Sequence, residues 1–173
     1  TMKFVTQSAS STAANRCITG SSVAQHVGPG GSVYMWYDGT ASRWMVELIS
    51  PGAPITPTFS AGDYTANGSM TWTVASGDVT SFNYIQWARA LLINFNISAT
   101  TVGGTLNTEL RIALPGGFAA ASSVEGLIRA IDNGSKAVGS LYIPPAATFI
   151  RCYRSVAGTD NWATATDTTY VLG

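Results

Sequence analysis

The stretch "YIQWARALLINFNIS", residues 84–98, is the longest apolar-leaning run of the chain and constrains the fold more than any other segment. It allows an amphipathic helix, one long strand, or two strands folded at "WARA". From Ala90 to Ser98, apolar and polar residues alternate with a period of two, which is typical of a strand with one covered face. A helix would have to hold Asn94, Asn96 and two β-branched isoleucines, which are poor helix formers. The alternation therefore favours a strand.

The length of the same run argues against a single strand. Fifteen residues in one strand would span about 50 Å, longer than strands of ordinary domains. A break near Ala88-Arg89 is therefore more reasonable than one unbroken strand. Neither residue is a typical turn former, so this run alone leaves the exact position of the turn open.

The rest of the chain has the texture of an all-β protein. Thr, Ser, Val, Ile and aromatic residues dominate the segments, and 18 glycines and 7 prolines separate them. One helix is possible at "GFAAASSVEGLIRAI", residues 117–131, or a single short turn near Ala119–Ser123, but Gly126 interrupts the helical pattern. Asn133-Gly134 is expected at a hairpin tip. Further strands are expected around 33–37, 44–48, 70–75, 80–87, 110–114, 149–154 and 167–173.

A proline-rich segment, "SPGAPITPT" at 50–58, marks the predicted domain boundary. Proline cannot donate to a sheet ladder, so the segment is a linker or an edge crossing. We expect a small N-terminal β module at 1–50, with a hairpin turning at Asp38-Gly39, and a second domain at 51–173. The aromatic residues Trp36, Tyr37 and Trp44 are interpreted as the core of the module. Trp72 and Trp87 are assigned to the core of the protein as well.

The charge content of the chain is low. Nine basic and nine acidic residues give a net charge of zero, and only 10% of residues are charged, against the usual ~25%. The absence of a basic patch argues against nucleic acid as a partner. So few charges favour burial of part of the surface in an oligomer. The sequence has no run as long as a membrane-spanning helix, and its N-terminus lacks the apolar region of a signal peptide.

Candidate catalytic groups are sparse. His26 is the single histidine and is not accompanied by a nucleophile motif. Cys17 and Cys152 match no zinc-site spacing and are interpreted as two thiols rather than a disulfide. Nucleotide-binding motifs are missing. We therefore expect no catalytic residue, no metal and no cofactor.

Paired carboxylates are the remaining enzymatic alternative. A polysaccharide depolymerase would need two carboxylates roughly 5–10 Å apart. Asp160 and Asp167 flank one loop, and Glu109 and Glu125 lie on predicted strands. We treat hydrolysis as the less favoured interpretation.

Sugar binding needs fewer groups: an aromatic ring to stack on a pyranose and polar side chains for its hydroxyls. The loop "AGTDNWATATDTT", 157–169, provides Asp160, Asn161, Trp162 and Asp167. It connects the last two predicted strands, where a sandwich presents its loops. These four residues are the candidate ligand-binding residues. The alternative is that Trp162 packs across a subunit interface or caps the sandwich.

The order of elements from about residue 54 to 173 resembles the C-terminal β-sandwich domain of bacteriophage tail fibre and receptor-binding proteins. The shared pattern has a "TPT" entry at 56–58, a Tyr-initiated strand, a turn and an apolar strand in "YIQWARALLINFNISA". It continues with "RIALPGGF", the Gly-rich hairpin "EGLIRAIDNGSKAVGSLYI" and a final aromatic and apolar strand pair. This order implies that the opening run is a hairpin, with strands at 84–87 and 90–98 and a turn near Ala88-Arg89. Such domains commonly have Gly-Asn or Gly-Asp after the Tyr strand, where this chain has Ala88-Arg89. The segment "VGPGGSVYMWYDGTASRWMVELIS" is similar to segments of phage virion proteins.

This resemblance implies a jelly-roll-like antiparallel β-sandwich preceded by a small N-terminal β-hairpin module. It also implies a homotrimer in the virion, at the tip of a fibre or spike. The sandwich would bind a host cell-surface glycan or protein without catalysis, and the N-terminal side would contact other virion proteins. A purely structural virion protein, such as a capsid decoration or a fibre connector, is the main alternative.

Overall fold

The computed structural model describes residues 2–6, 12, 16–20 and 24–173, which fold almost entirely into β-strands joined by turns. The chain divides into two compact units. Unit 1 comprises Thr1–Thr56 and Asn83–Ile93, and unit 2 comprises Pro57–Phe82 and Asn94–Gly173. Where we expected a boundary after residue 50, unit 1 continues to Thr56. It also contains the later segment 83–93, which the sequence did not indicate.

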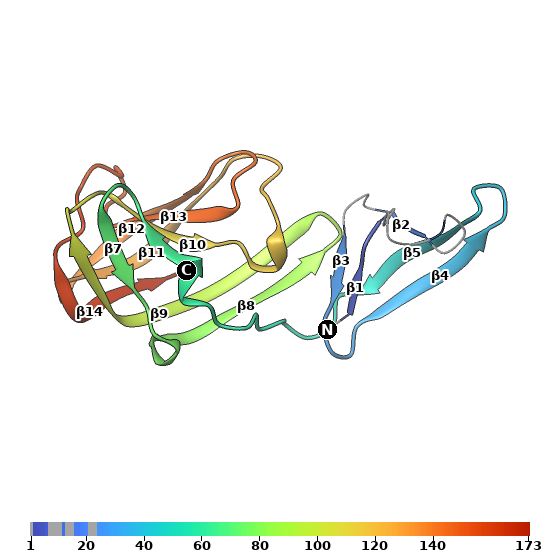
Figure 1. Cartoon of the computed structure of the whole chain (residues 1–173), viewed down its shortest axis with the longest axis horizontal. Coiled ribbons are helices and arrows are strands. Elements are labelled where there is room, and N and C mark those ends of the chain that lie inside the picture. The colour runs from blue at the N-terminus through green and yellow to red at the C-terminus, as the bar shows by residue number, and fades with distance from the viewer. Residues whose placement is uncertain (1, 7–11, 13–15, 21–23) are drawn as a thin grey trace. The chain divides into compact units, whose positions relative to one another are not determined.

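Unit 1 contains two small sheets (Figure 1). Its strands are β1 (Met2–Phe4), β2 (Cys17–Thr19), β3 (Gln25–Val27), β4 (Ser32–Asp38) and β5 (Arg43–Ser50). Strands β1 and β3 pair in antiparallel fashion. Strands β4 and β5 form the predicted hairpin, and β2 pairs with β5 in parallel. β4 is therefore an edge strand of its sheet.

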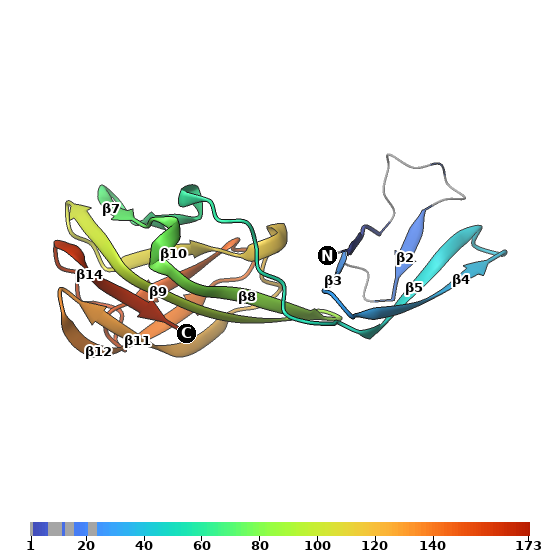
Figure 2. The same cartoon turned by 90° about the horizontal axis from the view of Figure 1, so that it is seen from below.

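One antiparallel sheet makes up most of unit 2, and it curls strongly (Figures 1 and 2). The strands run in the spatial order β6-β10-β13-β12-β11-β14-β9-β7, and β8 also pairs with β9. Residues 83–93, where β8 turns into β9, belong to unit 1. Strand β6 also contacts β7, at the opposite end of this order, so the sheet closes over its own inner face. This arrangement confirms the predicted all-β, sandwich-like fold. The strands are β6 (Tyr64–Ala66), β7 (Met70–Thr73), β8 (Val79–Trp87), β9 (Ala90–Gly104), β10 (Glu109–Ala113), β11 (Val124–Asp132), β12 (Ser135–Ile143), β13 (Phe149–Tyr153) and β14 (Ala165–Leu172).

Short 3-10 turns and tight turns connect these strands. The turn between β11 and β12 has positive φ at Asn133 (47°) and Gly134 (79°), as a two-residue type I′ hairpin turn requires, so the predicted tip is confirmed. Residues 119–123 form an irregular segment with a bend at 121–122 and no helical turn. The 3-10 turns lie at Ala61–Asp63, Ser76–Asp78 and Pro115–Gly117.

The inner face of the curled sheet forms the core of unit 2. Alternate residues point inward, as the pleat of a strand dictates. Trp72 is buried as predicted, and its indole N–H donates a hydrogen bond to Thr100 Oγ1 at 2.8 Å. Buried apolar residues of this unit include Ile97, Val102, Leu110, Ile112, Ile128, Ile150, Cys152, Trp162 and Val171.

The opening run forms the predicted hairpin. β8 ends at Trp87, β9 begins at Ala90, and the turn between them consists of Ala88 and Arg89. Ala88 has a φ of 51°, in the left-handed region that costs a residue with a Cβ atom about 1–2 kcal/mol. The turn therefore forms where the flanking strand pairing requires it, although its own residues do not favour it.

Strand β9 extends to Gly104, beyond the predicted end at Ser98, because it contains a bulge. Ala99 has a φ of 54°, and the pairing of β9 with β14 shifts register at this point. An extra residue in one strand moves the following side chains to the opposite parity. The buried residues change accordingly from Phe95 and Ile97 to Thr100 and Val102.

The assignment of aromatic residues to the core of unit 1 is wrong. Trp36, Tyr37 and Trp44 are 39–47% exposed, and Trp87 is 57% exposed. Alternation identifies the two faces of the β4–β5 ribbon, but the structure leaves large side chains exposed on both faces. On β8 the buried residues are Phe82, Tyr84 and Gln86, so Trp87 lies on the opposite, exposed face.

Candidate functional site

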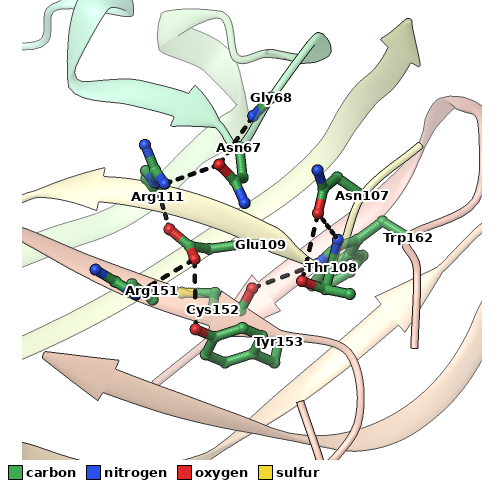
Figure 3. A network of polar contacts seen from close by, with 10 residues as sticks. All are labelled: Asn67, Gly68, Asn107, Thr108, Glu109, Arg111, Arg151, Cys152, Tyr153 and Trp162. Atoms are coloured by element: carbon green, nitrogen blue, oxygen red, sulfur yellow. Dashed lines mark hydrogen bonds and ion pairs between the residues drawn. The ribbon is translucent and has the colours of Figure 1, made fainter. Parts of the chain in front are cut away.

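The loop predicted to bind sugar is anchored by its own tryptophan. Trp162 is fully buried, its indole N–H donates to the backbone carbonyl of Cys152 at 3.3 Å, and its backbone N–H donates to Asn107 O at 2.9 Å (Figure 3). A ring with no exposed surface cannot stack on a sugar. The expectation that Trp162 forms a stacking platform is therefore wrong, and the alternative that it caps the sandwich is correct.

A second set of polar contacts holds the same loop. The Asp132 carboxylate is buried, accepts a hydrogen bond from the backbone N–H of Ala163 at 2.9 Å and pairs with Arg154 Nη1 at 2.8 Å. The same Arg154 nitrogen donates to the backbone carbonyl of Asn161 at 2.9 Å. Arg154 thus ties the loop to β11.

The three polar residues of the predicted set are exposed. Asp160 and Asn161 lie at the surface of the loop. Asp167 is in β14 with a φ of 52° and accepts a hydrogen bond from Thr101 Oγ1 at 3.3 Å. Asp160 and Asn161 therefore remain available to a ligand, without the aromatic ring that was to accompany them.

The outer face of the unit 2 sheet carries an ordered grid of polar and aromatic side chains. Strand pairing places Arg111 opposite Arg151, Arg151 opposite Tyr142, and Tyr142 opposite Glu125, in one row across β10, β13, β12 and β11. Since directly paired residues point to the same face, these side chains are neighbours. The next row contains Glu109, Tyr153, Ser140 and Leu127.

The Glu109 carboxylate is the centre of this grid. Its side chain is only 6% exposed and pairs with Arg111 Nε through Oε1. Oε2 lies 3.7 Å from Arg151 Nη1 and accepts a hydrogen bond from the Tyr153 hydroxyl at 3.4 Å (Figure 3). Arg111 Nη2 also donates to Asn67 Oδ1 at 3.1 Å. A buried carboxylate is tolerated here because charged and polar donors surround it.

Aromatic rings hold both guanidinium groups. The guanidinium carbon of Arg111 lies 4.8 Å from the centre of the Phe149 ring, and that of Arg151 lies 5.5 Å from the same ring and 5.8 Å from the Tyr142 ring. All three distances are within the range of cation–π attraction. The arginine side chains remain 28% and 31% exposed, so each still reaches solvent.

Burial raises the pKa of the Tyr153 hydroxyl, and the adjacent Glu109 charge reinforces this, while Arg151 opposes it. Tyr153 therefore stays protonated at neutral pH and serves as a donor. Burial, followed by the Glu109 charge, also raises the pKa of the Cys152 thiol. Both cysteines are free, but Cys152 is fully buried and Cys17 half-buried. The buried Cys152 is consequently a poor nucleophile.

A groove of about 530 Å³ lies beside this cluster. Tyr142 and Tyr153, which flank Arg151 in the grid, line it, and Leu127 and Val156 are 66% and 61% exposed. The start of the 157–169 loop provides another part of the lining. The groove therefore combines aromatic rings, apolar surface, the Ser140 hydroxyl and the Glu125 carboxylate, which is the kind of lining that a sugar requires.

Sequence reasoning missed this face. Alternation along β13 places Phe149, Arg151 and Tyr153 on one face and the buried Ile150 and Cys152 on the other. A charged and aromatic face opposite a strictly apolar one was the available signal. The sequence does not reveal the strand order, which places β10, β13, β12 and β11 side by side.

Unit 1 contains its own groove, of about 550 Å³, with Trp36, Glu47, Trp87 and Arg89 in its lining. His26 is buried in this unit, and its Nδ1 lies 2.8 Å from the Tyr84 hydroxyl. Burial, followed by the charge of Lys3, lowers the pKa of His26, which fits a structural histidine.

Within the described ranges, no cluster of three or more His, Cys, Asp or Glu residues could hold a metal ion. No helix among the same residues is long and apolar enough to cross a membrane. Comparison with protein-family models, curated proteins and solved structures finds no match.

Proposed function

We propose that this protein is a non-enzymatic binding protein that recognises a host cell-surface glycan, as the tip of a bacteriophage fibre or spike. The single observation that carries the binding site is the groove beside Tyr142 and Tyr153 on the outer face of the unit 2 sheet. The virion location and the homotrimer rest on the sequence resemblance to tail fibre and receptor-binding domains.

The chemistry of the groove supports a saccharide. Tyrosine rings offer an apolar face to a pyranose and a hydroxyl at its edge. The Glu125 carboxylate can accept hydrogen bonds from sugar hydroxyls, and so can the Ser140 oxygen, whose own hydrogen is donated to the Ser155 carbonyl. Because the groove is partly open to solvent, each site would bind weakly, and three sites in a trimer would gain affinity through effective concentration.

The test is a glycan array probed with the intact protein, followed by calorimetric titration of any saccharide that binds. We expect Tyr142→Ala and Tyr153→Ala to abolish binding, whereas Val138→Ser, on the same sheet face but outside the groove, leaves it unchanged. A separate Asp160→Ala, Asn161→Ala variant measures the contribution of the predicted loop residues. Failure of the correctly folded protein to bind any cell-surface glycan would refute the proposal.

A purely structural role in the virion is the second candidate, and the β4–β5 ribbon favours it. Tyr34, Met35, Trp36 and Tyr37 are successive residues of an edge strand, and each is 39–58% exposed. Such a surface is typical of a contact with another protein. In our proposal this ribbon serves assembly, through the homotrimer or other virion proteins, while unit 2 binds the glycan.

A further inference from the structure

On the outer face of the unit 2 sheet, two arginines, Arg111 and Arg151, surround a single carboxylate, that of Glu109. Arg111 and Arg151 are directly paired on β10 and β13, and like charges opposite each other destabilise a sheet. Glu109 compensates one of the two charges. The cluster of these three side chains thus keeps one uncompensated positive charge beside the groove.

Arg151 is the side chain with unused hydrogen-bonding capacity. Its Nη1 lies 3.7 Å from Glu109 Oε2, which is longer than a hydrogen bond, and its Nε is buried without a hydrogen-bond partner among the described residues. By contrast, Arg111 donates to both Glu109 and Asn67. The Nη groups of Arg151, whose side chain is 31% exposed, therefore have donors left for an additional acceptor, whereas its buried Nε cannot reach one.

The positive charge of the arginine cluster lies close to the groove because Arg151 is a neighbour of two residues that line it. In the grid, Arg151 is paired with Tyr142 on one side and lies two residues from Tyr153 on its own strand. Both tyrosines line the groove. A ring stacked against the tyrosines would thus place a substituent near the arginine cluster.

We propose that the groove binds a saccharide that carries a carboxylate, with the sugar ring against Tyr142 and Tyr153 and the carboxylate held by Arg151 and Arg111. Two guanidinium groups offer the paired N–H donors that a carboxylate accepts. Glu125, at the far end of the row, orients the ligand by repelling its carboxylate toward the arginines. This inference names the ligand class and rests on the proposed function of the same groove.

The probe is an oligogalacturonate, and its matched control is the same oligomer with methyl-esterified carboxylates. Calorimetric titration of the intact protein should show binding of the acid and much weaker binding of the ester. Arg151→Gln should weaken binding of the acid about tenfold or more, because a charge-assisted hydrogen bond is lost. Arg129→Gln, an equal change of charge on the same sheet face outside the row, should leave the affinity unchanged.

Glu109→Gln provides a variant whose effect has the opposite sign. Removing the compensating carboxylate leaves two guanidinium charges, so the affinity for the acid should rise while that for the ester stays the same. Thermal unfolding of each variant identifies those that remain folded. A purely structural Glu109 cluster predicts instead a loss of stability with no gain in affinity, which would overturn the inference.

The two proposals fail in different ways. Equal affinity for the acid and the ester, with loss of both in Tyr142→Ala, overturns the carboxylate inference and leaves the glycan-binding groove in place. Absence of saccharide binding both here and on the glycan array overturns both. Binding of the acid that Arg151→Gln does not weaken also overturns the inference.

Discussion

The indole N–H of Trp162 donates a hydrogen bond to the backbone carbonyl of Cys152, at 3.3 Å, and the ring is fully buried. This contact joins the 157–169 loop to β13, the strand that carries Arg151 and Tyr153. The loop and the candidate site therefore both depend on the position of β13. Trp162 contributes to the site by fixing the backbone behind it rather than by touching a ligand.

Trp162→Ala should destabilise the protein by about 3–5 kcal/mol, since it leaves a cavity of the size of an indole ring. Trp162→Phe keeps most of the ring and loses the hydrogen bond, so its cost should be about 1–3 kcal/mol. Chemical denaturation measures both. Equal stability of wild type and Trp162→Ala would contradict the burial of the ring.

The role of Trp162 illustrates what the sequence did not reveal. Its loop has no periodicity, so no pattern assigned the ring to a face, and an aromatic residue beside Asp160 and Asn161 resembled a sugar platform. In the ribbon of unit 1 the opposite error occurred. Alternation divided Trp36 and Tyr37 between the two faces of the ribbon. A sequence pattern shows which residues share a face, but it does not show whether another element packs against that face.

The 88–89 turn was predictable for a different reason. Strand length and alternation favoured a break in this run, and the order of elements shared with tail fibre domains indicated a turn near Ala88, whereas the local residues gave no turn signal. The bulge at Ala99 had no such signal, because a change of parity inside a long strand resembles the end of the strand.

Ala88→Gly should stabilise the hairpin by about 0.5–1 kcal/mol, because glycine adopts a positive φ without the Cβ penalty. Ala90→Gly, an exposed position at the start of β9 with no positive φ, is the matched control and should be neutral or destabilising. Thermal unfolding monitored by circular dichroism compares the two. Destabilisation by both glycines to the same extent would contradict the left-handed conformation of Ala88.

The exposed aromatic residues of the β4–β5 ribbon should cause self-association. Sedimentation velocity of the wild-type protein should show concentration-dependent oligomers, with a trimer as the proposed end state. Tyr34→Ser combined with Trp36→Ser should shift the distribution toward monomer, because their apolar surface drives burial. The control is Leu92→Ser, which removes an exposed apolar side chain outside the ribbon. A wild-type protein that stays monomeric at high concentration would refute this assembly role.

The stability of the fold should depend on pH through His26. Burial, followed by the charge of Lys3, lowers the pKa of His26 in the folded protein below its ordinary value of 6.5. The unfolded chain therefore binds the proton more readily than the folded protein, so stability rises with pH in the range where their protonation differs. The contribution of His26 is present above about pH 6.5 and is lost as the pH falls through the lowered folded-state pKa.

His26→Asn, which keeps a polar group facing the Tyr84 hydroxyl but does not titrate, should remove this part of the pH dependence. Denaturation of both proteins at a series of pH values from 7.5 to 4.5 measures the difference, and parallel curves for wild type and variant would show that His26 titrates normally.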